Sequence, residues 1–334
     1  MRTLAILLLF ISLLQGESVL KIATYNIENL FDLSRSGYEY EEYVPNTKAQ
    51  WNLKNYRIKL KNIAKVIKDI DADIIALQEI ESLVALKDLR LTLKQQGLYY
   101  QYYKIADNKN TTIKVAILSK IPFIYTKEIS VTKSYKYRNI LEAKFKIKNQ
   151  DLFLLVNHWK SKAGPESMRI ISAKTIKKRV QELGKNKNII LLGDFNSHYE
   201  ENKIFVRKRK HNDTDGITGI NDILATKKYK DRVENISLKN YAFYNLWYDT
   251  EVKDRFSYIF RGKKETLDNI LISQELINSS GIQYISHSIE SYKAPYLFKG
   301  KNIYRWQVRR KRPHIHKGKG YSDHLAVIAK FAVN

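Results

Sequence analysis

Runs of branched aliphatic residues that stop at a carboxylate are the most regular feature of this chain. Residues 189–192 are four consecutive aliphatics, and after Gly193 come a carboxylate and a carboxamide, Asp194 and Asn196. Residues 73–79 repeat the arrangement and end in Glu79. Such runs predict strands that are buried on both faces. A polar turn after a core strand would give the same local pattern, so other segments must decide between the two interpretations.

Amphipathic segments precede both of these strands. Apolar residues fall at helical spacing in residues 60–67 and 166–183, each with a basic outer face. A third helix is expected over residues 83–93, ending near Gly97. Because the chain twice runs from strand through helix to an acid-tipped strand, we expect an α/β fold with two halves stacked sheet on sheet and helices outside.

Further strands are predicted along the chain, with turns that indicate antiparallel pairing. Their ranges are Val19–Ile27, Tyr99–Ile105, Lys114–Leu118, Ile140–Ile147, Asp151–Val156, Arg255–Phe260, Thr266–Ile272 and Leu325–Phe331. The segment Tyr241–Tyr248 is strongly aromatic. Between residues 299 and 320, nine of 22 residues are Lys or Arg and none is acidic. Such a run is usually a solvated loop or a tail, and here a strand follows it.

Residues 1–18 predict a signal peptide, because Arg2 precedes an apolar stretch over residues 4–14 and small residues follow. A membrane anchor is the alternative, but eleven apolar residues are short for a span. No other stretch of the sequence is apolar enough to cross a bilayer. We therefore expect a secreted or periplasmic protein whose mature chain, residues 19–334, forms a single domain without stable membrane association. Cysteine is absent, so the fold must depend on core packing and not on disulfides.

Composition narrows the class of partner. Hydrophobic residues make up 44% of the 334 residues and aromatic residues 12%, which is typical of a packed globular protein. The formal net charge is +25. A charge of this size favours an anionic partner, either nucleic acid or an acidic membrane surface.

Polar clusters stand at the edges of the predicted strands: Asn26 with Glu28, Glu79, His158, Asp194 with Asn196, and Asp268 with Asp323 and His324. Hard oxygen ligands without cysteine suit an ion such as Mg²⁺. A histidine paired with a carboxylate can move protons or stabilise a transition state, although a lone histidine at a strand end is more often a simple hydrogen-bonding residue. Together these clusters favour a metal-assisted phosphodiesterase.

Five motifs occur in an order that resembles the endonuclease/exonuclease/phosphatase superfamily, in particular its secreted bacterial nucleases. They are YNIEN at 25–29, LQE at 77–79, NHWKSK at 157–162, LLGDFN at 191–196 together with LDNILIS at 267–273, and SDH at 322–324. The resemblance extends from about Val19 to Phe331. It implies a four-layered α-β-β-α sandwich with two packed, mostly antiparallel mixed sheets, and an active site at one end of both sheets.

The resemblance also implies roles for the clustered residues. Glu79 would be a metal carboxylate helped by Asn26, with Glu28 and Asp323 as further candidate ligands. The expected ion is Mg²⁺, with Mn²⁺ or Ca²⁺ as alternatives. As catalytic residues the likeness implies Asp194 to orient or deprotonate water, Asn196 to hold the phosphate, His324 oriented by Asp268, and His158 to contact the phosphate or protonate the leaving oxygen. One departure is Asn269, which stands where relatives often have an aromatic residue or histidine.

Charge favours a nucleic acid substrate, because a duplex presents a dense line of phosphates. Basic residues expected to flank the cleft are Lys160, Lys162, the run Arg207–Lys210 and the run Arg309–Arg312, which includes Arg310. The resemblance to the superfamily adds Arg138 as a basic phosphate contact. We therefore predict an exported, monomeric, metal-dependent nuclease that acts on DNA, with RNA as an alternative substrate, and with little sequence preference.

Two alternative classes stay open. A secreted sphingomyelinase-like phospholipid phosphodiesterase would use the same centre, but it should show exposed apolar loops, and only Tyr241–Tyr248 is a candidate. A basic binding module without catalysis would be expected to lack at least one of Glu79, His158, Asp194 and His324, and all four are present.

Overall fold

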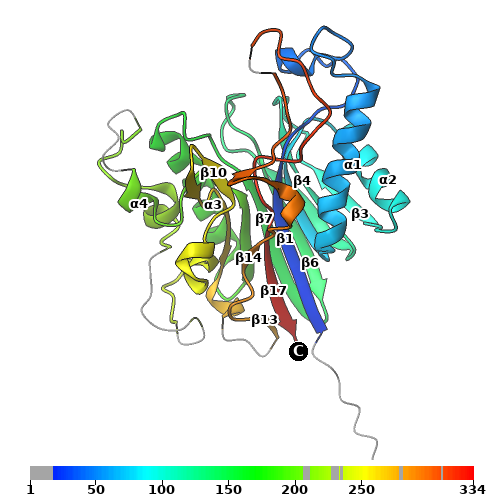
Figure 1. Cartoon of the computed structure of the whole chain (residues 1–334). Coiled ribbons are helices and arrows are strands. Elements are labelled where there is room, and N and C mark those ends of the chain that lie inside the picture. The colour runs from blue at the N-terminus through cyan, green and yellow to red at the C-terminus, as the bar shows by residue number, and fades with distance from the viewer. Residues whose placement is uncertain (1–17, 206–210, 227–232, 234–235, 278–280, 310) are drawn as a thin grey trace, which may run out of the picture.

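Two β-sheets lie face to face in the computed structural model, and helices cover the outer faces (Figure 1). The structure describes residues 18–205, 211–226, 233, 236–277, 281–309 and 311–334. The signal peptide predicted over residues 1–18, apart from Ser18, the basic run at 207–210, and Arg310 lie outside the described residues.

The first sheet has seven strands in the order β13-β17-β1-β2-β4-β3, with β14 also paired to β17. Strands β1 and β2 are parallel, and the other pairs are antiparallel. The strands are β1 (Ser18–Leu30), β2 (Ile74–Ile80), β3 (Tyr102–Ile105), β4 (Lys114–Ser119), β13 (Ile282–Tyr284), β14 (Glu290–Ser291) and β17 (Val327–Val333).

The second sheet has six strands in the order β5-β6-β7-β8-β12-β9, and β7 and β8 form its parallel pair. The strands are β5 (Phe123–Ile129), β6 (Ile140–Ile147), β7 (Gln150–His158), β8 (Asn188–Asp194), β9 (Tyr244–Asn245) and β12 (Asp268–Ile272). Two small hairpins lie outside the main sheets: β10 (Tyr258–Phe260) with β11 (Lys263–Glu265), and β15 (Phe298–Lys299) with β16 (Asn302–Ile303).

Helices α1 (Leu53–Ile70) and α2 (Leu83–Gln95) share one apolar core with the first sheet, and α3 (Glu166–Leu183) shares another with the second. The side chains of Asn52 and Ser82 cap the first two helices by accepting hydrogen bonds from backbone amides of their first turns. The remaining helices are short: η1 (Glu41–Tyr43), α4 (Glu201–Ile204), η2 (Gly219–Ile223), η4 (Leu246–Asp249), η5 (Val252–Asp254), η6 (Gln274–Leu276) and η7 (Pro295–Leu297).

A third core lies between the two sheets, and alternate residues of the central strands explain the layering. Ile22, Ile74 and Ile190 point into the inter-sheet core, whereas their neighbours Ala23 and Ile75 face the helices of the first half. These strands are therefore buried on both faces, as their continuous aliphatic runs predict. The predicted four-layered α-β-β-α sandwich is confirmed.

Several element boundaries differ from the sequence-based expectation. Helix α1 begins at Leu53, seven residues before the apolar series used to predict it, and strand β5 was not predicted. The aromatic segment at 241–248 forms β9 and η4 and is largely buried. The expectation of a solvated basic loop at 299–320 is wrong in part, because Trp306 and His316 are 2% exposed and pack against the N-terminal half.

Among the described residues, no helix combines the length and the apolar character that a membrane span requires.

Candidate active site

The ends of six strands bring the predicted polar residues to one rim of the sandwich. Because β1 and β2 are parallel, their carboxyl ends place Asn26 and Glu79 side by side. The parallel pair β7 and β8 does the same for His158 and Asp194, which are register partners. Strands β12 and β17 run antiparallel to these pairs, so their amino-terminal ends bring Asp268 and His324 to the same rim.

Backbone conformation at this rim is unusual. Glu28, Glu79 and Asn196 have positive φ angles of 52°, 68° and 47°. Such angles are uncommon for residues other than glycine and occur where a side chain must be turned out of a regular element. The pairing between β2 and β4 shifts register between Gln78 and Ile80, so Glu79 lies in a bulge that redirects its carboxylate.

Gly193 fits this rim because of the close approach of β7. Its φ is 133°, and a Cβ atom at this position would lie 2.1 Å from the backbone oxygen of Asn157. A side chain here would therefore push β7 and β8 apart just before His158 and Asp194. The glycine of the Gly-Asp-Phe-Asn segment is needed for the parallel pairing that aligns the two side chains.

The amide of Asn26 joins the two sheets. Its Nδ2 donates to Glu79 Oε1 on the first sheet and to Asp194 Oδ2 on the second, both at 3.1 Å. Glu79 Oε2 accepts a further bond from the backbone N–H of Asn29 at 3.0 Å. Asn26 therefore fixes the separation of two acids that belong to different halves of the protein.

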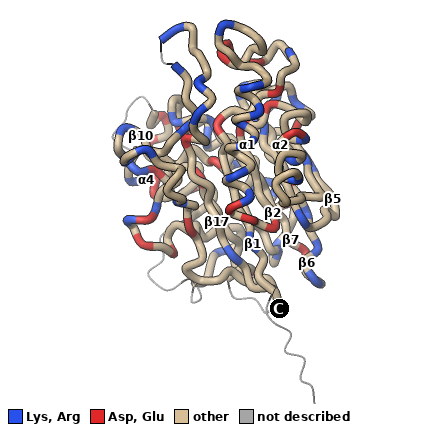
Figure 2. The backbone as a smooth tube through the Cα atoms, turned by 45° about the vertical axis from the view of Figure 1, so that its right-hand side comes forward, with Lys and Arg blue, Asp and Glu red and all other residues tan. Residues whose placement is uncertain are grey.

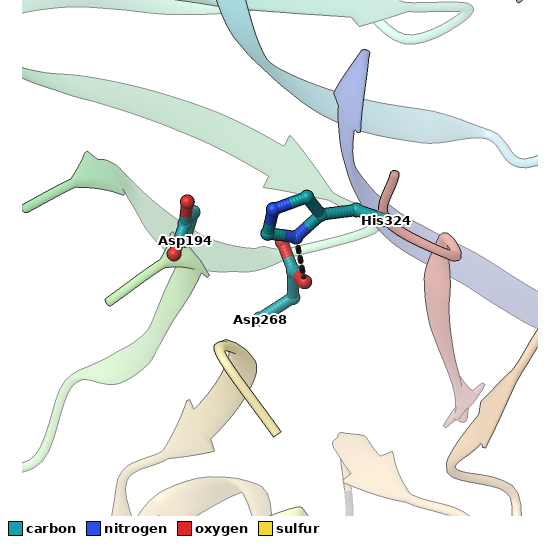
Figure 3. Close-up of side chains that lie close together, drawn as sticks. All are labelled: Asp194, Asp268 and His324. Atoms are coloured by element: carbon teal, nitrogen blue, oxygen red, sulfur yellow. Dashed lines mark hydrogen bonds and ion pairs between the residues drawn. The ribbon is translucent and has the colours of Figure 1, made fainter. Parts of the chain in front are cut away.

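His324 forms a buried dyad with Asp268. Its Nδ1 lies 2.6 Å from Asp268 Oδ2 (Figure 3). The same oxygen accepts a hydrogen bond from Ser257 Oγ at 2.6 Å. Burial alone would lower the pKa of the His324 imidazole, but the charge and hydrogen bond of Asp268, with Asp323 and Asp194 nearby, raise this pKa well above its ordinary value. The ring is therefore an imidazolium at neutral pH.

His158 also lies beside Asp194, but the pKa of its imidazole is shifted in the opposite direction. Its Nε2 is 3.5 Å from Asp194 Oδ2 and 3.8 Å from Glu79 Oε1, and its buried Nδ1 has no hydrogen-bond partner. Burial and the positive charge of Arg138 lower the pKa of the His158 imidazole well below its ordinary value. This ring is therefore neutral at pH 7.

Asp194 stands between the two imidazoles. Oδ1 accepts from the backbone N–H of Asn196 at 2.8 Å, and Oδ2 accepts from Asn26. Burial raises the pKa of Asp194 to about 7, with the neighbouring Asp268 carboxylate acting in the same direction and His324 opposing it. A carboxyl group with this pKa can exchange a proton near neutral pH, which suits a general base.

Two groups of residues have the composition of a metal site. Atoms of Asp194, Asp268 and His324 lie within 4.8 Å of one another. However, Nδ1 of His324 is already committed to Asp268, which suits proton handling better than metal ligation. Glu79 is the stronger candidate, because its carboxylate, 18% exposed, accepts hydrogen bonds from two amides and forms no ion pair with a lysine or arginine of the described residues. A partly buried carboxylate without a directly paired cation fits a hard divalent ion, and the charges of His324 and Arg138 act on it only from a greater distance.

Glu28 and Asp323, the other two predicted metal ligands, lie beside Arg305. Glu28 Oε1 accepts from Arg305 Nε at 2.8 Å, and its Oε2 accepts from the backbone N–H of Trp306 at 3.0 Å. Asp323 Oδ2 is 3.2 Å from Arg305 Nη2. Both carboxylates therefore have a protein cation as a partner, unlike Glu79.

A cavity of about 690 Å³ opens onto the centre and is lined by Glu79, His158, Asp194, Asn196 and His324. Of the basic residues predicted to contact substrate, Arg138 and Lys160 line this cavity, and Arg138 also donates to the backbone oxygen of Trp159. Lys162 lines it too, but its Nζ is paired with Glu201 at 2.8 Å and Glu265 at 3.2 Å. Arg309 is exposed, and its guanidinium donates to the backbone oxygens of Lys311 and Pro313.

Three residues of the centre have no signal in the sequence. Ser257 orients Asp268, Tyr258 packs its ring 4.8 Å from that of His324, and Arg305 pairs with Glu28. The isolated bridge between Tyr258 and His324 could not be foreseen from either local pattern.

Residues 21–332 match the Endonuclease/Exonuclease/phosphatase family. The chain belongs to this family. Its members are phosphoesterases that generally use a divalent metal ion. A search of curated proteins found no relative that matches.

Solved structures support the same fold at low sequence identity. Truncated TDP2 from Caenorhabditis elegans is 18% identical, with 94% of this chain and 98% of that chain covered and a TM-score of 0.54. TDP2 from D. rerio, solved with a single-strand DNA product, is 12% identical, with 94% and 99% covered and a TM-score of 0.58. A mannosyl-6-phosphatase from Bacteroides thetaiotaomicron is 15% identical, with 93% and 99% covered and a TM-score of 0.55.

Proposed function

We propose that this protein is an exported, metal-dependent phosphodiesterase that cleaves nucleic acid, DNA first of all, with little sequence preference. The observation that carries the proposal is that Asp194 lies close to both a protonated and a neutral imidazole, with the carboxylate of Glu79, which has no directly paired lysine or arginine among the described residues, nearby. This arrangement supplies a base, a fixed positive charge and a cation site around one phosphate-sized space.

In this proposal Asp194 accepts the proton of the attacking water at a carboxylate oxygen. The imidazolium of His324 hydrogen-bonds a non-bridging phosphate oxygen through Nε2 and keeps its proton, because Asp268 holds Nδ1 at 2.6 Å. Attack on phosphorus breaks its bond to the leaving oxygen, which takes up a proton from solvent, and the proton held by Asp194 then returns to solvent. The neutral His158 ring directs Nε2 toward the same space and donates a hydrogen bond to the leaving oxygen, while the side chain of Asn196 positions the phosphate. Glu79 and Asn26 would hold the divalent ion, which neutralises the charge that develops on the phosphate.

Charge and cavity lining support nucleic acid as the substrate class. The net charge of +25 favours a polyanion, and Lys and Arg are spread over the whole chain and not confined to one element (Figure 2). Arg138 and Lys160 place positive charge inside the cavity itself. The D. rerio TDP2 neighbour binds a single-strand DNA product, whereas the Bacteroides neighbour is a sugar phosphatase, so fold similarity alone leaves the substrate open.

Export is proposed from the N-terminal sequence, where Arg2 and the apolar stretch over residues 4–14 precede the small residues Gly16 and Ser18, which suit signal-peptide cleavage. Recovery of a chain that begins near Val19 from outside the cytoplasm, as shown by its intact mass, would support this part of the proposal.

The test of the activity uses the purified mature chain with supercoiled plasmid DNA, RNA, sphingomyelin and mannose 6-phosphate, each with Mg²⁺ and with a chelator. We expect nicking of the plasmid that requires Mg²⁺ and is lost in the Asp194→Asn variant. Release of phosphocholine or of inorganic phosphate without cleavage of either nucleic acid would overturn the assignment.

A further inference from the structure

Besides Asp268, which is paired with His324, four acidic side chains gather at the rim, and the protein compensates them unequally. Glu79 and Asp194 have amide donors and imidazoles as neighbours. Glu28 and Asp323 lie near each other, since nitrogens of a single guanidinium contact both carboxylates. These two acids, unlike the first two, are bridged by the guanidinium of Arg305.

Arg305 contacts both carboxylates at hydrogen-bond or ion-pair distance. Arg305 Nε donates to Glu28 Oε1 at 2.8 Å, and Arg305 Nη2 lies 3.2 Å from Asp323 Oδ2. The remaining oxygen of Glu28 accepts the backbone N–H of Trp306. One guanidinium therefore contacts an oxygen of each carboxylate. A small metal ion bound between the two carboxylates would otherwise contact these oxygens.

The segment that carries Arg305 is held firmly in place. Trp306 is buried, and its Nε1 donates to Nδ1 of His316 at 2.8 Å. Gly320 has a φ of 91°, and a Cβ atom there would lie 1.9 Å from the backbone oxygen of Arg305. Packing of Trp306 and the close approach of Gly320 thus fix the backbone at Arg305, and the side chain, 53% exposed, extends from this fixed point to the two carboxylates.

A second cation stands behind this bridge. Lys59 on α1 is fully buried, its Nζ donates to the backbone oxygen of Tyr321 at 3.0 Å, and it lies 5.2 Å from the centre of the Trp306 ring. Burial lowers the pKa of Lys59 to about 8, although the charges of Glu28 and Asp323 oppose this shift. The Glu28–Asp323 side of the centre is therefore already supplied with positive charge by the protein.

We propose that the Arg305 guanidinium takes the place of a second metal ion, so that the centre binds one divalent cation, at Glu79 and Asn26, and not two. This inference rests on the proposed function only in so far as that function requires a metal. A divalent ion at Glu28 and Asp323 would compete with Arg305 and the Trp306 amide for both oxygens of Glu28 and with Arg305 for Oδ2 of Asp323. Removal of the guanidinium alone should open that second position.

The test counts Mn²⁺ ions bound by the mature chain, by calorimetry and by electron paramagnetic resonance of free Mn²⁺. We expect one ion for the unmodified protein, two for Arg305→Met, which keeps much of the side-chain volume without the charge, and one for Arg305→Lys. Without metal, Arg305→Met should have a lower melting temperature, and added Mn²⁺ should raise that temperature more than it does for the unmodified protein.

Matched variants make the count specific. Arg309→Met removes a guanidinium of the same segment that contacts only backbone oxygens, so one ion should still bind. Arg305→Met combined with Glu28→Gln lacks a ligand of the opened position and should return to one ion, with less destabilisation than Arg305→Met alone. Circular dichroism establishes that each counted variant is folded, and the double variant provides the count if Arg305→Met does not fold.

Two ions in the unmodified protein, or one ion in a folded Arg305→Met variant, would overturn the inference. If only the double variant folds, two ions bound to it would overturn the inference as well. Plasmid nicking is measured on the same samples. If the unmodified protein nicks the plasmid but folded Arg305→Met binds the same number of ions as it does, this inference fails and the proposed function stands. If Arg305→Met binds two ions and the unmodified protein one, but no plasmid is nicked, the proposed function fails and this inference stands.

Discussion

His158 and His324 are two buried imidazoles beside the same carboxylate, yet they differ in almost every other respect. His324 has a carboxylate at 2.6 Å and a pKa well above its ordinary value. His158 has an unpartnered Nδ1, lies near Arg138, and has a pKa well below its ordinary value. Both are equally removed from water, so burial alone cannot explain the difference. The partner of each ring decides its charge, and this gives the centre an imidazolium and a neutral imidazole at one pH.

The largest effect should come from Asp268→Asn, which removes the carboxylate that keeps His324 protonated while His158 is neutral. We expect kcat to fall by roughly 10³-fold, because the imidazolium loses both its orientation and its stabilising charge. The alkaline limb of the pH–rate profile should move to lower pH, since His324 would then lose its proton more easily. Ser257→Ala, which removes only one hydrogen bond to Asp268, is the matched control and should cost about tenfold. If the alkaline limb does not move in Asp268→Asn, the protonation state of His324 does not determine the rate.

His158→Ala should lower kcat by about 10²-fold or more while leaving folding and DNA binding nearly intact. Because this ring is neutral, its removal should not change the salt dependence of binding, measured by fluorescence anisotropy at several salt concentrations. His324→Ala removes a positive charge and should reduce both turnover and, slightly, the salt slope. Full activity in either variant would exclude that histidine from the mechanism.

Asp194→Asn should lower the activity and raise the free energy of unfolding. The pKa of Asp194 is raised to about 7, above its unfolded value of about 3.9, so the metal-free folded state holds the proton more tightly. The stability from this group is complete below about pH 3.9 and is lost as the pH rises through about 7. We therefore expect the variant to gain on the order of a few kcal/mol relative to the unmodified protein between pH 4 and pH 8. Urea unfolding with a chelator at both pH values measures this, and an equal difference at both would contradict it.

The smallest effect should come from the cations around His158. Arg138 contributes more than Lys160 to the lowered pKa of this ring. Arg138→Met should therefore raise the pKa of His158, and Lys160→Met should raise it by less, as followed by NMR titration of the ring protons. Lys162→Met is a suitable control, because Lys162 is paired with Glu201 and Glu265. A larger rise of the His158 pKa in Lys160→Met than in Arg138→Met would show that Arg138 is not the main cation acting on this ring.

Much of the fold could be predicted because its strands carry their own signal. Continuous aliphatic runs at 73–79 and 189–192 indicated strands buried on both faces, and the acids at their ends meet at the predicted rim. The carboxylates, the two histidines and the two asparagines that converge there were visible as strand-end clusters, whereas Ser257, Tyr258 and Arg305 were not. Their roles as ligands, bases and phosphate contacts remain predictions, since geometry shows proximity and not catalysis.

The rest of the centre could not be predicted because it depends on contacts between distant residues. Arg305 pairs with Glu28 across 277 positions in the sequence, and its segment has the composition of a solvated loop. Strand β5 escaped prediction because it is half-exposed at the edge of the second sheet, where the aliphatic pattern is weak. Local periodicity reports burial within an element, but it does not report which cation an acid will meet.

Because Asn26 donates hydrogen bonds to residues of both sheets, reactivity depends on how the two sheets are aligned. A slip of the sheets by a single residue would move the amide by about 3.3 Å, farther than a hydrogen bond to Asp194 can stretch. Changes in side-chain volume deep between the sheets, far from any substrate, should therefore alter turnover before they unfold the protein. The apolar filling at Ile22, Ile74 and Leu192 sets the alignment of the chemistry as much as the polar residues do.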